Sequence, residues 1–180
     1  MRGVVRILGL VLAVATLGAD LESRVLTHYV PQDLLETAVR TEGWTEVPLN
    51  LKGGVRKGDV VRIWVGGVID FGNGDQPGQN IATPDGVQGG SSSADPAKLV
   101  LSTDPSHGLA LLFKSDGPDI RRWLPAGKPL EIKLTKDKER LWVGFNDEKG
   151  RYQDNHLGRG RRHEFDALWV RAEVVRIIVD

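Results

Sequence analysis

Hydrophobic residues alternate with polar or aromatic ones along several short stretches of the chain. In residues 59–68, Val61, Ile63 and Val65 alternate with Arg62 and Trp64. This period of two is typical of a strand with one buried face. Similar runs occupy residues 109–113, 130–134, 141–145 and 165–174. The pattern therefore predicts five or more short strands.

Turn-forming residues separate these runs. They stand at Gly53-Gly54, Lys57-Gly58-Asp59, Pro125-Ala126-Gly127-Lys128, Lys136-Asp137-Lys138 and Glu148-Lys149-Gly150. Short strands at such spacing favour an antiparallel sandwich. The length of 180 residues fits one domain, and the 22 Gly and 9 Pro suit many turns better than long helices. We predict an all-β, single-domain antiparallel β-sandwich.

Three segments depart from the strand pattern. Residues 20–32 show no clear period, and we interpret residues 20–35 as a lead-in to a domain over 36–180. Leu34, Leu35, Ala38 and Val39 fit either a helical turn or a strand, and the pattern does not decide between them. Residues 70–96 are rich in Gly, Pro and Ser and predict a long loop, which in a compact domain is usually functional or disordered.

The N-terminus has the pattern of a secretory signal. Arg2 and Arg6 precede an apolar run that closes with the small residues Gly18 and Ala19. This run is shorter than the roughly 20 residues that span a bilayer. We predict a signal peptide over 1–19, an exported protein that is secreted, periplasmic or on the cell surface, and no membrane span after cleavage. An uncleaved membrane anchor is the alternative. With no cysteine, the domain forms no disulfides.

Charge and motifs argue against several function classes. The 24 Lys and Arg balance the 24 Asp and Glu, which argues against a nucleic-acid partner. Ser102, Asp104 and His107 lie within six residues, whereas triad members normally converge from separate segments. His156 and His163 do not match zinc spacing. We therefore expect a protein that is not an enzyme.

Oxygen-bearing side chains gather directly after the predicted strand 141–145. They are Asn146, Asp147, Glu148, Asp154 and Asn155, grouped around Gly150. Calcium takes about six to eight oxygen ligands, which carboxylates, amides and main-chain carbonyls provide. The spacing does not fit an EF-hand. A calcium loop and an ordinary polar hairpin loop are both compatible with this composition.

The same segment resembles the PA-I type of calcium-dependent, galactose-binding bacterial lectins. In that family a strand ending in Asn-Asp leads through a Gly-containing loop to an acid or amide pair, as in Asn146-Asp147, Gly150 and Asp154-Asn155. Residues 57–63, 69–72 and 108–114 resemble three other family segments, in the family's order. The resemblance covers about residues 36–175 and implies a jelly-roll-like, galactose-binding-domain-like sandwich.

The resemblance implies a Ca²⁺ site and a sugar site. Calcium would be held by side-chain oxygens of Asp147, Asp154 and Asn155 and by main-chain carbonyls of Phe71 and Arg151. Sugar hydroxyls would complete the coordination. The residues expected to contact the sugar are Phe71, Gln88, Asp147, Glu148, Arg151 and Asp154. The expected partner is a glycan or glycoconjugate. Because single sugar sites bind weakly, we also expect a homo-oligomer.

The chain departs from the family in the loop after Phe71. The family places a sugar-contacting His and Gln there, whereas residues 78–93 contain no His, and Gln88 or Asn80 would have to substitute as donors. The glycan is therefore left open between galactose and another sugar. The alternative function is an exported structural or protein-interaction module, which calcium would stabilise and which binds no sugar. A hydrolase-like accessory domain ranks third.

Aromatic and basic residues offer two further candidates for contacts with a ligand. Of the five tryptophans, Trp64, Trp142 and Trp169 lie in predicted strands, where packing is the simpler role. Trp123 lies near a turn and is kept as a candidate for stacking on a sugar ring. We interpret the basic run Arg159–His163 as a solvated turn rather than a phosphate or acidic-glycan site.

Overall fold

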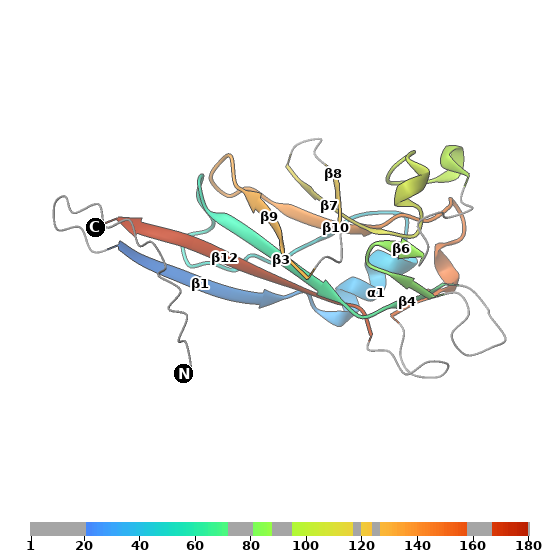
Figure 1. Cartoon of the computed structure of the whole chain (residues 1–180), viewed down its shortest axis with the longest axis horizontal. Coiled ribbons are helices and arrows are strands. Elements are labelled where there is room, and N and C mark those ends of the chain that lie inside the picture. The colour runs from blue at the N-terminus through green and yellow to red at the C-terminus, as the bar shows by residue number, and fades with distance from the viewer. Residues whose placement is uncertain are drawn as a thin grey trace, which may run out of the picture.

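The computed structural model describes residues 21–71, 81–87, 95–116, 120–123, 127–157 and 167–179, which form three antiparallel sheets (Figure 1). The first has the order β1 (Leu21–Tyr29), β12 (Trp169–Val179), β3 (Val60–Gly66) and β9 (Leu130–Lys133). The second has the order β2 (Thr45–Glu46), β10 (Leu141–Phe145), β7 (Leu111–Ser115) and β8 (Ile120–Arg122). The third has the order β11 (Asn155–His156), β4 (Ile69–Phe71), β5 (Ile81–Thr83) and β6 (Gly86–Val87).

One α-helix and three short 3₁₀ helices accompany these sheets. They are α1 (Gln32–Arg40), η1 (Pro96–Lys98), η2 (Pro105–His107) and η3 (Tyr152–Asp154). All strand pairs in the sheets are antiparallel. The predicted all-β sandwich is confirmed.

The core lies between the first and second sheets. Alternate residues of β3, β9, β12, β7 and β10 point inward, as the period of two predicted. The first sheet contributes Val61, Ile63, Ile132, Val170, Ala172 and Val174, and the second contributes Leu111, Phe113, Leu141, Val143 and Phe145. Burial of these side chains is the main favourable term that holds the sheets together.

The segment expected to be a lead-in is instead a strand. β1 pairs with β12 over nine residues, from Leu21 opposite Val179 to Tyr29 opposite Arg171. The alternation is weak here because β1 lies at a sheet edge, where both Val25 and Leu26 are exposed. The residues left undecided between helix and strand belong to α1, which buries Leu35, Ala38 and Val39 on one face. Residues 21–29 therefore belong to the first sheet, and residues 32–35 belong to α1.

The N-terminal prediction lies outside the described residues. These begin at Leu21, so the signal peptide over 1–19 stays a prediction. Among the described residues, no helix is long and apolar enough to cross a membrane.

The predicted run 109–113 and the predicted loop 70–96 differ from the observed elements, and the run 165–174 corresponds to β12, which begins at Trp169 and ends at Val179. The run 109–113 starts as a strand only at Leu111, because Leu109 has a left-handed φ of 57° and donates its N–H to the Asn146 carbonyl. Within the predicted loop 70–96, β5 and β6 form a hairpin around Pro84-Asp85. Residues 72–80 and 88–94, which include Gln88 and Asn80, lie outside the described residues.

The tryptophans mostly serve packing. Trp123 is buried in the core, so its proposed role in stacking on a sugar is wrong, because its ring faces are covered. The guanidinium of Arg171 lies 5.1 Å from the ring centre of Trp64, and that of Arg140 lies 5.0 Å from Trp142. These cations occupy ring faces that a sugar would need. The basic run Arg159–His163 lies outside the described residues.

Candidate functional site

The loop after β10 turns back on itself around a buried tyrosine. The hydroxyl of Tyr152 donates to the Phe145 carbonyl at 2.7 Å and accepts the Asp147 N–H at 3.0 Å. Burial raises the pKa of Tyr152 to about 12, so the hydroxyl keeps the proton that it donates. Gly150 closes the turn with a φ of 81°, a conformation that costs glycine little. The loop is thereby held in one shape.

Asp147 is a buried carboxylate in crowded negative surroundings. Its Oδ1 accepts the Glu148 N–H at 2.7 Å, and its Oδ2 accepts from Asn155 Nδ2 at 2.9 Å. Burial raises the pKa of the Asp147 carboxyl, and the neighbouring carboxylates of Asp154 and Glu148 add to the rise. The two hydrogen bonds lower this pKa only in part. Such a position favours either a proton or a cation beside the carboxylate.

Asn155 is fully buried and is oriented by two hydrogen bonds. Its Nδ2 donates to the Val39 carbonyl at 2.9 Å and to Asp147 Oδ2 at 2.9 Å. Its Oδ1 is buried without a hydrogen-bond partner. A buried polar atom left unpaired costs about 1–3 kcal/mol. A hard cation is a suitable partner for this amide oxygen, because calcium binds oxygen ligands.

The other predicted calcium ligands belong to the same loop or to the strand that pairs with it. Phe71 is the cross-strand partner of Asn155 in the β4–β11 pair, which places its main chain opposite that of Asn155. Asp154 ends η3, next to Asn155, and its charge acts on Asp147. Arg151 precedes η3 and donates its N–H to the Glu148 carbonyl at 3.0 Å. All five predicted ligands thus belong to one loop and the strand that it meets.

The described residues hold no group of three His, Cys, Asp or Glu side chains that could bind a metal ion. The proposed set is of another kind, since it combines two carboxylates with an amide and two main-chain carbonyls. The donor types and the unpaired Asn155 oxygen fit calcium.

An open hollow of about 460 Å³ lies beside these residues. It is lined by Gly150, Arg151, Gln153, Asp154 and His156. Arg151 is largely exposed there, and Gln153 and His156 add further polar groups. The sequence did not single out Gln153 or His156 as sugar contacts. Their position in the sequence, beside Asp154 and Asn155, is the signal that could have identified them.

Glu148 does not line this hollow. Its Oε1 accepts the Asp95 N–H at 3.2 Å, and its Oε2 lies 3.3 Å from Arg151 Nε. The carboxylate is therefore engaged with the segment before η1 and with the Arg151 side chain. Its predicted sugar contact has no support from this position.

Helix α1 and the residues after it hold the loop of the site by hydrogen bonds. Besides the Val39 carbonyl, three of its side chains or neighbours contact the loop: Arg40 donates to the Gln153 carbonyl at 3.1 Å, Glu36 accepts the Leu157 N–H at 3.2 Å, and Glu42 accepts the Gly150 N–H at 2.8 Å. This role could not be predicted from the sequence, because the pattern of residues 34–39 does not distinguish a helix from a strand. The helix holds the loop by contacts that join residues more than a hundred positions apart.

Asn146 holds the loop before β7 in place by hydrogen bonds. Its Oδ1 accepts the N–H groups of Leu101 and Ser102, and its Nδ2 donates to the carbonyls of Ser102 and His107. Asn146 itself is fully buried. This asparagine therefore fixes residues 101–107 against the strand that carries the candidate ligands.

Replacing Asn146 by alanine should lower the free energy of unfolding by about 3 kcal/mol, because four partly buried backbone groups lose their partner. Urea denaturation followed by tryptophan fluorescence measures this change. The exposed Asn50, replaced by alanine, is the control and should shift the midpoint little. Equal shifts from both variants would show that the Asn146 hydrogen bonds contribute no more than a surface residue.

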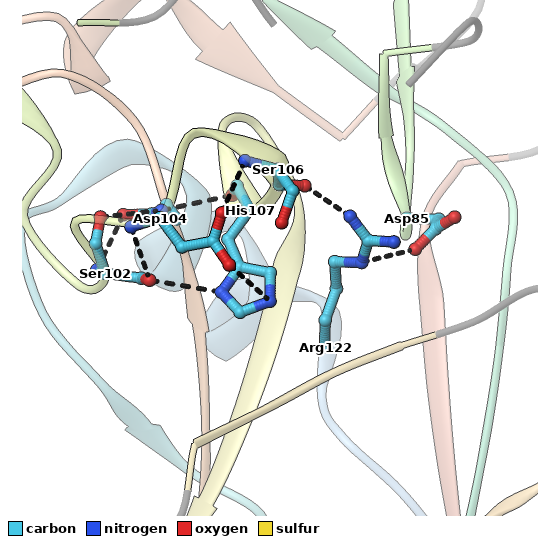
Figure 2. A network of polar contacts seen from close by, with 7 residues as sticks. Asp85, Ser102, Asp104, Ser106, His107 and Arg122 are labelled. Carbon is cyan, nitrogen blue, oxygen red and sulfur yellow. Dashed lines mark hydrogen bonds and ion pairs between the residues drawn. The ribbon is translucent and has the colours of Figure 1, made fainter. Parts of the chain in front are cut away.

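The loop of residues 101–107, which Asn146 holds, contains a polar network that Figure 2 shows. Ser102 Oγ lies 3.1 Å from His107 Nδ1, and His107 Nε2 lies 4.0 Å from Asp104 Oδ2. Ser102, Asp104 and His107, which lie closer in sequence than the members of a typical triad, thus also lie close together in space. However, Ser102 Oγ also accepts the Asp104 N–H, and the Asp104 carboxylate accepts the Ser106 N–H. These bonds stabilise the turn.

Arg122 joins this network to the third sheet. Its Nε lies 2.9 Å from Asp85 Oδ1, and its Nη1 donates to the Ser106 carbonyl (Figure 2). Asp85 lies in the turn between β5 and β6, so one guanidinium connects β8, η2 and this turn. The network thus links the loop of residues 101–107 to the turn between β5 and β6.

No protein-family model and no curated protein matches the chain. A solved structure that it resembles is described as "EclA N-terminal domain; PllA-like lectin", with 17% sequence identity and a TM-score of 0.37. The match covers 87% of this chain and 98% of that chain. A likeness at this level does not extend to binding, metal or specificity.

Proposed function

We propose that this protein is a calcium-dependent, non-catalytic glycan-binding protein. The observation that carries the proposal is the buried, unpaired Oδ1 of Asn155 beside the crowded carboxylates of Asp147 and Asp154. Phe71 and Arg151 are the proposed main-chain ligands. An exported location, predicted from residues 1–19, suits a glycan partner outside the cell.

The protein's own residues prepare the site before any ligand binds. Asn155 is held by the Val39 carbonyl, and Asp147 is held by Asn155 and by the Glu148 N–H. Little ordering entropy is therefore lost when the shell forms. Bound calcium would supply positive charge and open coordination positions for two neighbouring sugar hydroxyls.

The hollow beside the shell provides the remaining sugar contacts. The side chains of Arg151, Gln153 and His156 offer hydrogen-bond donors to hydroxyls that do not touch the cation. A hollow that is this open buries few sugar atoms, so we expect weak binding at each single site.

Calorimetric titration of the metal-stripped protein with calcium is the first test. We expect one saturable site, followed by sugar binding in calcium that a chelator abolishes, in a panel that starts with galactose. Calcium binding without any sugar binding would favour the alternative, a calcium-stabilised structural or protein-interaction module. Absence of calcium binding would overturn the proposed shell.

A side-chain variant separates sugar contacts from calcium ligands. Arg151→Ala should weaken glycan binding severalfold and leave calcium affinity nearly unchanged, because the proposed calcium ligand at this position is the carbonyl. Lys149→Ala is the matched control, since Lys149 is an exposed cation that does not line the hollow. Equal glycan affinity in both variants would remove the hollow from the proposal.

A further inference from the structure

β1 is the longest free sheet edge among the described residues. It ends the first sheet and pairs only with β12, over nine residues. The other edge strands of the three sheets have four residues or fewer: β9, β2, β8, β11 and β6. A strand edge presents unpaired N–H and C=O groups in the spacing that another strand requires.

Several of the usual protections of such an edge are missing from β1. Residues 21–29 contain neither proline nor lysine, and their pairing with β12 continues without a bulge. The charged residues of the strand are Glu22 and Arg24, which stand opposite His28 and Leu26 of a second copy when the strands pair antiparallel about Val25. Val25 is 53% exposed, Leu26 is 41% exposed and Tyr29 is 61% exposed. These are three of the six exposed large hydrophobic residues in the described part of the chain, and the others are scattered at Leu34, Val100 and Ile120.

The exposed side chains lie on both faces of the edge. Val25 and Tyr29 are four positions apart and share one face, while Leu26 lies on the other, because successive side chains alternate. A molecule that covered only one face would leave the other exposed. An added β-strand satisfies the main-chain groups and shields both faces at once.

We propose that β1 pairs antiparallel with β1 of a second copy of this chain, across a two-fold axis close to Val25. A two-fold antiparallel pair is self-complementary, because residue i meets j and residue j meets i. Val25 is the central residue of the strand, so it meets its own copy. The two first sheets then join into one sheet of eight strands, four from each copy.

The contact is small. Nine residues extend about 30 Å along the edge, which gives an interface near the lower end of the usual size range, where weak and transient complexes are common. We therefore expect a dimer that dissociates in the micromolar range.

The pairing matters for glycan binding, and this step alone rests on the proposed function. β1 lies in the half of the molecule away from β4 and the candidate site (Figure 1). The dimer therefore presents its two sites far from the shared edge. Two weak sites that act together gain avidity without any new contact at either site.

The test is the mass of the full chain, measured by light scattering and sedimentation equilibrium from low to high micromolar concentration, with calcium and with a chelator. We expect a dimer in both conditions. Val25→Lys should give a monomer with an unchanged melting temperature and unchanged calcium binding. Ile120→Lys, on the edge strand β8 of the second sheet, is the matched control and should stay dimeric.

The absence of cysteine allows a second measurement. Under mild oxidation Val25→Cys should form a disulfide-linked dimer, because facing residues of an antiparallel pair are close enough for a disulfide. Ile120→Cys should not. A monomer at all concentrations, or a dimer that Val25→Lys leaves intact, would overturn the pairing. Neither outcome depends on calcium or sugar, so the proposed function would stand or fall separately.

Discussion

Asp154→Ala should lower calcium affinity by about a hundredfold or more, because the proposed shell loses one of two carboxylates. The shell depends on charge as well as on oxygen count. Asp154 is near enough to Asp147 for its charge to raise the pKa of the Asp147 carboxyl. Removing it leaves a single carboxylate, one amide and two carbonyls. Calorimetric titration of the metal-stripped variant measures the loss.

Glu148→Ala is the matched control for this loss. Glu148 is an acid in the same loop, but its carboxylate contacts the Asp95 N–H and the Arg151 side chain. We expect its removal to change calcium affinity by less than about tenfold, the effect of a charge near the ion rather than of a ligand. Equal losses from the two variants would contradict the assignment of Asp154 as a ligand.

Asp59→Ala should destabilise the fold by about 3 kcal/mol, because the buried Asp59 carboxylate accepts charge-assisted hydrogen bonds from Arg176, whose side chain is partly buried. Arg176 Nε donates to Asp59 Oδ1 at 3.0 Å, and Arg176 Nη2 donates to Asp59 Oδ2 at 2.7 Å. The same Nη2 donates to the Gly54 carbonyl at 2.9 Å. The pair joins β12 to the turn before β3, and without Asp59 the partly buried guanidinium keeps only its hydrogen bond to the Gly54 carbonyl. Urea denaturation measures the change.

Asp137→Ala tests whether the effect depends on burial. Asp137 Oδ1 accepts the Lys57 N–H at 2.9 Å, in the same turn region but at the exposed surface. We expect its loss to cost less than about 1 kcal/mol. A similar cost for both aspartates would show that the Arg176 pair contributes no special stability.

The Asp59 pair also predicts a pH dependence. Burial raises the pKa of the Asp59 carboxyl, but the bonds from Arg176 and from the Arg56 N–H outweigh it, and the net pKa lies below the ordinary 3.8. Because the folded state has the lower pKa, the pair stabilises the protein fully above 3.8 and loses this contribution as the pH falls through the folded value. Wild-type stability should therefore fall more steeply below this pH than that of Asp59→Asn. Parallel curves would contradict the pairing.

The sequence by itself determined the sandwich and the composition of the candidate loop. Period-two runs at 59–68, 130–134 and 141–145 became β3, β9 and β10, because a strand with one face on a core needs that alternation wherever it lies. The loop after residue 145 already contained its acids and amides in a fixed order. Such information is local, so it can be read along the chain.

Only the tertiary structure decided the features that depend on distant contacts. β1 has little alternation because an edge strand has little to bury, and its pairing with β12 joins opposite ends of the chain. The orientation of Asn155 depends on Val39 in α1, and Trp123 is buried although it lies near a turn. Ser102 and His107 meet because Asn146 folds their loop. Burial and hydrogen bonding at these positions are set by partners far away in the sequence, which no local pattern contains.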